Sequence, residues 1–500
     1  MQQTPRTDRP FAFDRSIAAV LGVAVLYRMI FLVQIRSSAF FQVPLIDSWE
    51  YHLDALRILT HGQPHHIAFW HPPAYPYLLA GIYGLTGSTA MLWPALANML
   101  FGVLCVYLTF IIARIVSGPR SAPIAAILAL MQPVLMTFEV QRLSVSLECL
   151  LNLLWILLML LAFRAPDRRL VVFATGIVLG LSIVTRPTVL LLVPVAIVVL
   201  ASHRRHIMPF IIGVLLIVSP VTIRNYLVSD EIVLVSSNGG INFFVGNNPD
   251  FRKTTALRPG SEWSMLIQRH PDQDGAMASA EWYREGFRFI AANPGQAVRN
   301  NLWKLFQTIH ASEIIRNIDF KEFRNNATIM RFPGVDFGWL IALAVPGLCI
   351  MTPGSSRRVI ALYLVMMMVS IVIFFAATRY RLPMVHLLAV CASVTILRGT
   401  DAIRSRRFRR EDWILAGSAA ALLTLTHLPV QTGLPTDIQR RDTLMNLADV
   451  EERSGDLSAA AGYLEQVIAT DASFPDAYQR LGVYARSEEH TSELQSRFGI

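Results

Sequence analysis

Long runs of apolar residues, separated by short polar segments, recur through most of this chain. Many of these runs reach the roughly 17–25 residues that a helix needs to cross a bilayer. The pattern therefore predicts an α-helical, polytopic membrane protein with about eleven spans. The predicted spans are 16–35, 91–113, 121–138, 143–163, 170–185, 187–201, 207–223, 335–351, 358–376, 383–397 and 412–428.

Charge is scarce and unevenly placed. Only 16% of the 500 residues are charged, against about 25% in average soluble domains. The net charge of +9 does not indicate nucleic acid, because the arginines gather in alternate loops between the spans, as the positive-inside rule describes for cytoplasmic loops. The N-terminus is therefore predicted to be cytoplasmic, with the C-terminal tail outside. The basic loops contain Arg6, Arg9 and Arg15; Arg114 and Arg120; Arg164, Arg168 and Arg169; Arg204 and Arg205; Arg357 and Arg358; and Arg404, Arg406, Arg407, Arg409 and Arg410.

Two larger outer loops belong to the predicted membrane region 1–430. The first, 37–90, has the periodicity of an amphipathic helix from Asp47 to Thr60. The second, 224–333, has mixed character. In it we expect strand-like runs at 231–237 and 242–246, separated by a Gly-Gly turn, and helices at 276–291 and 295–310.

Residues 436–485 are polar and helical in pattern. Leu444 and Tyr478, and likewise Leu447 and Leu481, are 34 positions apart, which is the period of a tetratricopeptide repeat. One unit and a fragment cannot bury their faces alone, so a truncated repeat array is predicted, and a protein partner could bind through these repeats. Segment 486–500 begins with eleven residues that match a translated sequencing adapter, and we interpret it as a non-native tail.

Carboxylates in the first outer loop are the leading candidates for chemistry. Asp47, Glu50 and Asp54 recur at i, i+3 and i+7 and so share a helix face. Acids near lipid are costly, which makes them functional candidates. Asp47, at the start of the predicted helix, is our candidate general base. The alternative is a simple helix cap.

The aromatic and proline residues after this helix complete a recognisable pattern. It resembles the first loop of bacterial family-39-like glycosyltransferases of the C-type fold, which include protein O-mannosyltransferases and aminoarabinose transferases of lipid A. Relatives carry Asp-Glu in tandem where this chain has Asp47-Ser48, and Glu50 is the candidate to replace the second acid. The resemblance implies that Tyr51, His71 and Tyr75 bind substrate. The pattern consists of Asp47, Tyr51, Pro72, Pro73, Tyr75 and Pro76.

A second acid, Glu139, ends a span on the predicted outer side. The resemblance assigns it to orienting the acceptor or to holding a divalent metal with Asp47. The alternative is an ion pair with nearby Arg142. Glu148 and Arg28 lie within spans and receive no assignment. The histidines of the first loop, including His65 and His66, follow no standard zinc spacing, and no cofactor is predicted.

Four arginines lie at outer ends of spans, against the positive-inside rule: Arg186, Arg224, Arg379 and Arg381. Arginine binds phosphate through two parallel hydrogen bonds. The alternative is snorkelling to lipid headgroups. We predict that at least two of the four share one pocket with Asp47.

The resemblance implies an inverting transferase in the bacterial cytoplasmic membrane. It would move a hexosyl or pentosyl group from polyprenyl phosphate to a hydroxyl of a glycan, lipid or protein on the outer face. Two other hypotheses remain open: a non-enzymatic scaffold or transporter whose repeats bind partners, and a ligase that transfers a whole glycan.

Overall fold

A computed structural model describes residues 15–61, 67–164, 169–258, 260–269, 275–316, 319–332 and 334–498. Helices dominate these ranges, and no strand occurs within them. The predicted helical fold class is therefore confirmed. Arg6, Arg9, Arg168, His65 and His66, which entered the sequence predictions, lie outside the described residues.

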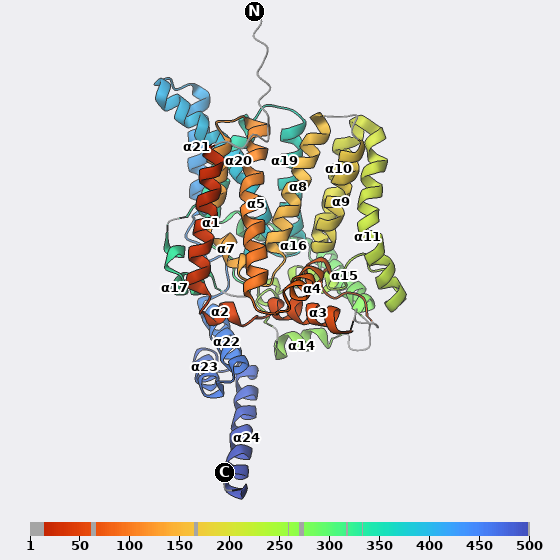
Figure 1. Ribbon diagram of the computed structural model, residues 1–500, viewed down its shortest axis with the longest axis vertical. Helices are drawn as coiled ribbons and strands as arrows, with labels where there is room; N and C mark the ends of the chain where they lie inside the picture. The colour runs from red at the N-terminus through yellow and green to blue at the C-terminus, as the bar shows by residue number, and fades with distance from the viewer. Residues whose placement is uncertain are drawn as a thin grey trace, which may run out of the picture.

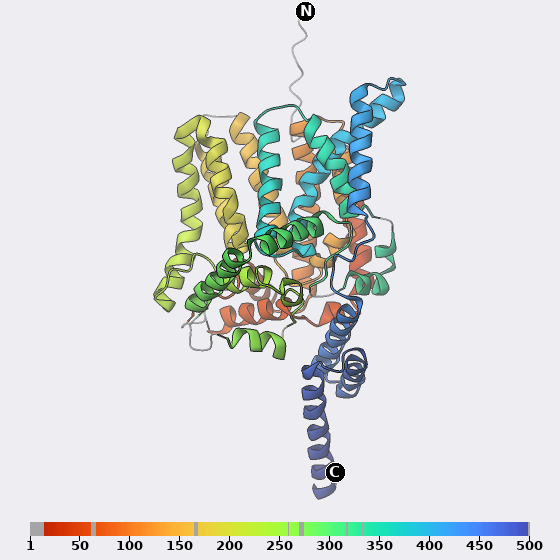
Figure 2. The same ribbon diagram turned by 180° about the vertical axis from the view of Figure 1, so that it is seen from behind.

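Each of the eleven predicted spans is helical. They form one bundle of helices that run side by side (Figures 1 and 2). The spans are α1 (Arg15–Ile35), α5 (Leu92–Ser117), α6 (Ala122–Leu130) with α7 (Pro133–Glu139), α8 (Val145–Arg164), α9 (Arg169–Thr185), η1 (Pro187–Leu191) with α10 (Leu192–Leu200), α11 (Ile207–Ser229), α18 (Phe337–Ile350), α19 (Ser355–Ile373), α20 (Thr378–Ser405) and α21 (Arg410–Thr426).

Helix length and apolar composition show which of these helices could cross a membrane. Among the described residues, six are long and apolar enough to cross a bilayer, and the α6–α7 pair, bent by 60°, makes a seventh if it counts as one span. Three shorter apolar segments are α9, η1–α10 and α18. Helix α21 has 17 residues and follows the basic loop that ends at Arg409. The chain is thus a multi-pass membrane protein.

Shorter helices cover one end of the bundle (Figure 1). The expected helices of both outer loops are present, at 47–60, 276–291 and 295–310, each within two residues. This layer consists of α2 (Ala39–Gln42), α3 (Asp47–His61), α4 (Ala74–Thr86), α12 (Gly239–Gly246), α13 (Phe251–Thr254), α14 (Ser261–Ile267), α15 (Gly275–Ala292), α16 (Pro294–Ile309), α17 (Phe320–Asn326) and η3 (Thr328–Arg331).

The predicted strands in the long outer loop are wrong. Residues 231–237 are irregular, and 242–246 belong to helix α12. The helix buries Ile241, Phe244 and Val245 against aromatic side chains of other segments. Gly246 allows its backbone to meet another chain segment, because an added Cβ would lie 1.7 Å from the carbonyl oxygen of Phe374. Tertiary packing therefore outweighs the β-propensity of this apolar run.

Three C-terminal helices project from the same end of the bundle as α3 and α14 (Figures 1 and 2). They are α22 (Thr436–Ser454), α23 (Leu457–Thr470) and α24 (Pro475–Phe498). Leu444, Leu464 and Phe474 belong to their shared apolar core. The helix-turn-helix shape agrees with the predicted repeat, whose identity stays a prediction. Helix α24 continues through the segment interpreted as a non-native tail.

Candidate active site

A cavity of about 1420 Å³ lies where the outer layer meets the bundle. Its walls come from segments far apart in sequence, among them α3, the α9–η1 junction, α11, α12, α20 and α22. One wall is apolar, and residues of α9, α10 and α11 make up much of it. This wall includes Ile183, Val193, Ile197, Ile211, Val214, Leu215 and Val218.

The remaining wall is charged. Five arginines and three carboxylates line the cavity, so cationic groups are in excess. The arginines come from five different places in the chain, and only Arg186 and Arg379 are among the four that the sequence predicts as candidates for a pocket with Asp47. The charged lining residues are Asp47, Glu50, Asp449, Arg186, Arg258, Arg316, Arg379 and Arg453.

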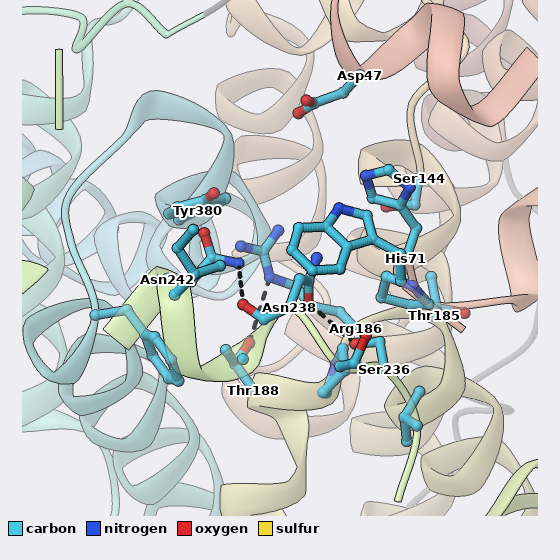
Figure 3. A pocket seen from close by; sticks show the side chains of 18 of the residues that line it. Asp47, His71, Ser144, Thr185, Arg186, Thr188, Ser236, Asn238, Asn242 and Tyr380 are labelled. Carbon is cyan, nitrogen blue, oxygen red and sulfur yellow. Dashed lines mark hydrogen bonds between the residues drawn. The ribbon is translucent and has the colours of Figure 1, made fainter. Parts of the chain in front are cut away.

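Asp47 lies in the first turn of α3 and faces the cavity (Figure 3). Its carboxylate accepts a hydrogen bond from Arg379 and forms an ion pair with it. Burial alone would raise the pKa of Asp47, but the Arg379 charge and hydrogen bond outweigh it and hold the pKa at about 2. Asp47 is therefore ionised and already engaged by a cation.

Arg379 and Arg186 meet at the ring of Tyr380. The guanidinium carbon of Arg186 lies 4.0 Å from the ring centroid, and that of Arg379 lies 5.0 Å from it. Arg379 also donates to the Tyr380 hydroxyl at 3.0 Å, while its Nε is buried without a partner among the described residues. The prediction that at least two of the four arginines share a pocket with Asp47 is met by these two.

Arg186 forms an ion pair with Glu148. Its Nη1 lies 3.2 Å from Oε2 of Glu148, a fully buried acid of α8, and its Nε donates to the Thr188 hydroxyl at 3.3 Å. Figure 3 shows Arg186 near Asn238 and Asn242 of the α12 segment. The sequence flagged Glu148 as an unassigned acid within a span. A buried acid is costly without a partner, and Arg186 provides one.

The aromatic residues of the first loop lie beside Asp47. Tyr51 and His71 line the cavity with their ring centroids 5.2 Å apart. Burial, together with the Asp47 charge, raises the pKa of Tyr51 to about 12. Tyr75 is buried, its ring centroid lies 5.6 Å from that of Tyr51, and its hydroxyl forms a hydrogen bond with the side chain of Asn98. Glu50 faces the cavity rim.

Besides Tyr75, three candidate site residues do not line the cavity. Glu139 forms a buried ion pair with Arg28 at 2.7 Å, not with Arg142 and not with Asp47. Arg224 stacks over Phe69 at 4.1 Å and donates to the Ile67 carbonyl. Arg381 is 1% exposed, forms an ion pair with Glu313 and donates a hydrogen bond to the His310 carbonyl. None of the three lines the cavity, so their roles in the site remain predictions without geometric support.

Arg316 was not among the predicted site residues. It lines the cavity near Asp47, stacks on Phe375 at 4.4 Å and donates to the Thr255 carbonyl at 2.6 Å. Burial lowers its pKa from the ordinary arginine value. Its position in the polar loop 224–333 gave no sign that it lies opposite α3. Within the described ranges, no group of three His, Cys, Asp or Glu side chains is arranged to hold a metal ion.

Comparison with solved structures gives remote similarity. The archaeal oligosaccharyltransferase AglB from Archaeoglobus fulgidus, solved with an inhibitory peptide and a dolichol-phosphate, is 15% identical, with a TM-score of 0.44. That match covers 89% of this chain and 59% of AglB, so the chain spans about three fifths of its length. ArnT from Cupriavidus metallidurans, bound to undecaprenyl phosphate, is 14% identical, with a TM-score of 0.44, and the match covers 93% of this chain and 76% of ArnT.

Comparison of sequences identifies a similar family over part of the chain. No curated protein matches the chain. Residues 70–223, about a third of the chain, match the family model described as dolichyl-phosphate-mannose-protein mannosyltransferase. The matched segment runs from within the first outer loop to α11, and it contains Arg186 and much of the apolar cavity wall. Over these residues the chain resembles that family, which confirms the predicted resemblance to polytopic glycosyltransferases.

Proposed function

We propose that this protein transfers a sugar from a polyprenyl-phosphate donor to an acceptor hydroxyl, with inversion at the anomeric carbon. One observation carries the proposal: Asp47 shares a cavity with Arg186, Arg316 and Arg379, and the opposite wall of that cavity is apolar. A base, a cluster of phosphate-binding cations and an apolar channel are the three parts that such a transfer needs.

The donor would bind across both walls. Its polyprenyl chain would lie along the apolar residues of α10 and α11, which bury hydrocarbon favourably. Its phosphate would lie between Arg186 and Arg379, whose guanidinium groups converge on Tyr380. The buried, unpartnered Nε of Arg379 is a donor that a phosphate oxygen would satisfy. Arg316 adds a third positive charge to the same wall.

The ion pair between Asp47 and Arg379 has to open for catalysis. A carboxylate with a pKa of about 2 is a poor proton acceptor, since an effective base has a pKa nearer the working pH. A donor phosphate competes with Asp47 for Arg379. When Arg379 turns toward the phosphate, Asp47 loses its main stabilising charge, and its pKa rises. Donor binding would therefore activate the base.

In the proposed transfer step, one bond forms at the anomeric carbon and one breaks. Asp47 takes the proton from the acceptor hydroxyl as the acceptor oxygen forms a bond to the anomeric carbon. The bond between that carbon and the phosphate oxygen breaks, and its electron pair leaves with polyprenyl phosphate. The arginines stabilise the negative charge that develops there, in a partly desolvated site where such charges interact strongly. Tyr51 and His71 would contact the sugar beside Asp47.

The proposed location is the outer face of the bacterial cytoplasmic membrane, with the N-terminus in the cytoplasm. The alternation of basic loops supports this orientation. The outer-layer helices and the C-terminal helices lie at one end of the bundle (Figure 1), and residues of both line the cavity, so all three would share one side of the membrane. The acceptor would be a glycan, lipid or protein on that side.

The decisive experiment uses purified protein in liposomes with radiolabelled polyprenyl-phosphate hexoses and pentoses. Transfer to an acceptor extract, with an inverted anomeric configuration in the product, is the expected result. Asp47→Asn provides the inactive control. Absence of transfer with every donor, in protein that binds polyprenyl phosphate, would favour the scaffold or transporter hypothesis. Transfer from oligosaccharide donors alone would favour the ligase.

A further inference from the structure

The C-terminal helix α22 packs against the turn that leads into Asp47. Val450 belongs to one apolar cluster with Phe40 and Leu45, and Leu447 packs against the same cluster. Arg453 donates through Nη1 to the Pro44 carbonyl oxygen at 2.5 Å. Its guanidinium carbon lies 4.2 Å from the ring centroid of Trp49. Arg453 thus contacts the chain on both sides of Asp47.

The turn held in this way is strained. Ile46, the residue immediately before Asp47, has a φ of +50°. This left-handed conformation is unfavourable for L-residues and rare for β-branched ones. A strained backbone of this kind persists only when surrounding contacts fix it. Ile46 itself packs against the cluster that contains Val450.

A second set of contacts fixes α22 in place. Asp449, one turn before Arg453, forms an ion pair with Arg258 of the long outer loop and another with Arg480 of α24. Arg258 is buried and also donates to the Asp442 carbonyl at 2.8 Å. The amide of Ser261 donates at 2.9 Å to the carboxylate of Asp476, which lies on α24 in the same apolar cluster of helices as α22. The helix is therefore anchored to the outer layer independently of the turn at Pro44–Asp47.

From these contacts we infer that α22 is a clamp that holds the Asp47 turn in its strained conformation, and that Arg453 is a positioning residue for Asp47. The inference rests on the proposed function, in which Asp47 is the base. Arg453 does not need to touch substrate. It fixes the peptide at Pro44 and the ring of Trp49, so that the carboxylate between them points into the cavity.

The test uses the full chain in liposomes and two readouts. Arg453→Ala should lower kcat by about tenfold to a hundredfold, because small misplacements of a reacting group have effects of that size, while the donor KM stays the same. Hydrogen exchange of the amides at 45–50 should accelerate about tenfold, since the turn loses its clamp. Arg453→Lys, which keeps a cation and a donor, should fall between wild type and Arg453→Ala.

A rescue experiment separates a clamp from a general structural role. Glycine adopts positive φ without strain, so Ile46→Gly should restore part of kcat in the Arg453→Ala background. The matched control is Arg440→Ala, which removes an exposed arginine from the same helix and should leave both readouts unchanged.

The outcomes that overturn the inference are distinct from those that overturn the function. Unchanged exchange at 45–50 in Arg453→Ala would show that α22 does not hold the turn. Faster exchange with unchanged kcat, or no rescue by Ile46→Gly, would show that the held conformation does not matter for transfer. If wild type transfers no sugar, the proposed function fails and Arg453 has no role in turnover, whereas the exchange result still decides whether α22 holds the turn.

Discussion

Replacing Asp47 with asparagine tests the proposed mechanism most directly. The substitution keeps the shape of the side chain and removes the proton acceptor. Loss of a general base lowers rates by about 10²–10⁴-fold, so kcat should fall in that range while the donor KM stays similar or decreases. A lower KM is expected where Arg379, released from its ion pair with Asp47, becomes fully available to the donor phosphate.

The same substitution should destabilise the protein. The pKa of Asp47 is lowered from 3.8 to about 2, which corresponds to about 2 kcal/mol at neutral pH. Because the folded-state pKa lies below the unfolded one, this contribution is present above about pH 4 and is lost as the pH falls toward 2. The stability difference between wild type and Asp47→Asn should therefore close over that interval.

The pH dependence of transfer should also report the ionisation of Asp47. The acid limb of kcat/KM reports the free enzyme and that of kcat reports the donor complex. Since donor binding draws Arg379 away from Asp47, the acid limb of kcat should lie at higher pH than the acid limb of kcat/KM. Coincident limbs would contradict the exchange of partners by Arg379.

The assay measures transfer in liposomes across a pH series, together with unfolding in detergent. Asp401→Asn is the matched control, because Asp401 also pairs with an arginine, Arg120, but both side chains are largely exposed and such pairs contribute little. A double variant, Asp47→Asn with Arg379→Gln, should recover stability by removing the unpaired cation. Near wild-type turnover in Asp47→Asn would exclude Asp47 as the base.

Three further predictions concern other parts of the molecule. Arg186→Gln should raise the donor KM about tenfold or more by removing a charged phosphate contact, with Arg186→Lys partly restoring it; an unchanged KM would remove Arg186 from the donor site. Burial lowers the pKa of Lys304 to about 7, so wild-type stability should rise from pH 7 to about 10.5 as the unfolded lysine alone stays charged, and Lys304→Met should abolish that rise in unfolding experiments. Reporter fusions after Arg169 and Arg410 should report cytoplasm and one near Gly433 the outer side, and a cytoplasmic signal at Gly433 would invert the topology.

Local patterns predicted most of the fold. The apolar runs gave all eleven helical segments, and the amphipathic period of 47–60 gave α3. The failure at α12 has a physical cause: Ile241, Phe244 and Val245 form a short apolar run, and such a run is equally compatible with a buried strand or a buried helix. Which of the two forms depends on the surfaces available to cover it, and these come from distant segments.

The site was only partly predictable. Sidedness brought the four outer arginines to the same end of the bundle, but it could not specify which of them face the cavity. Arg381, two residues after Arg379 on α20, points about 200° around the helix from it by the ordinary helical rotation, and it is buried against Glu313 instead. The pairing of Glu148 with Arg186 and the approach of α22 to Pro44 are tertiary contacts with no local signal.

Two contacts that hold Asp47 in place would change differently during the proposed reaction cycle. One is the ion pair with Arg379, which lies 332 positions further along the chain and which the donor phosphate would take over. The other is the contact of Arg453 with Pro44 and Trp49, which involves neither Arg379 nor the carboxylate of Asp47, although Arg453 and Trp49 also line the cavity. At the moment when the base must act, the first contact is weakened, and α3 would be free to shift unless something else held its first turn. A clamp that does not depend on the charge of Asp47 meets that requirement, which gives a reason for a C-terminal helix to lie against a membrane-embedded site.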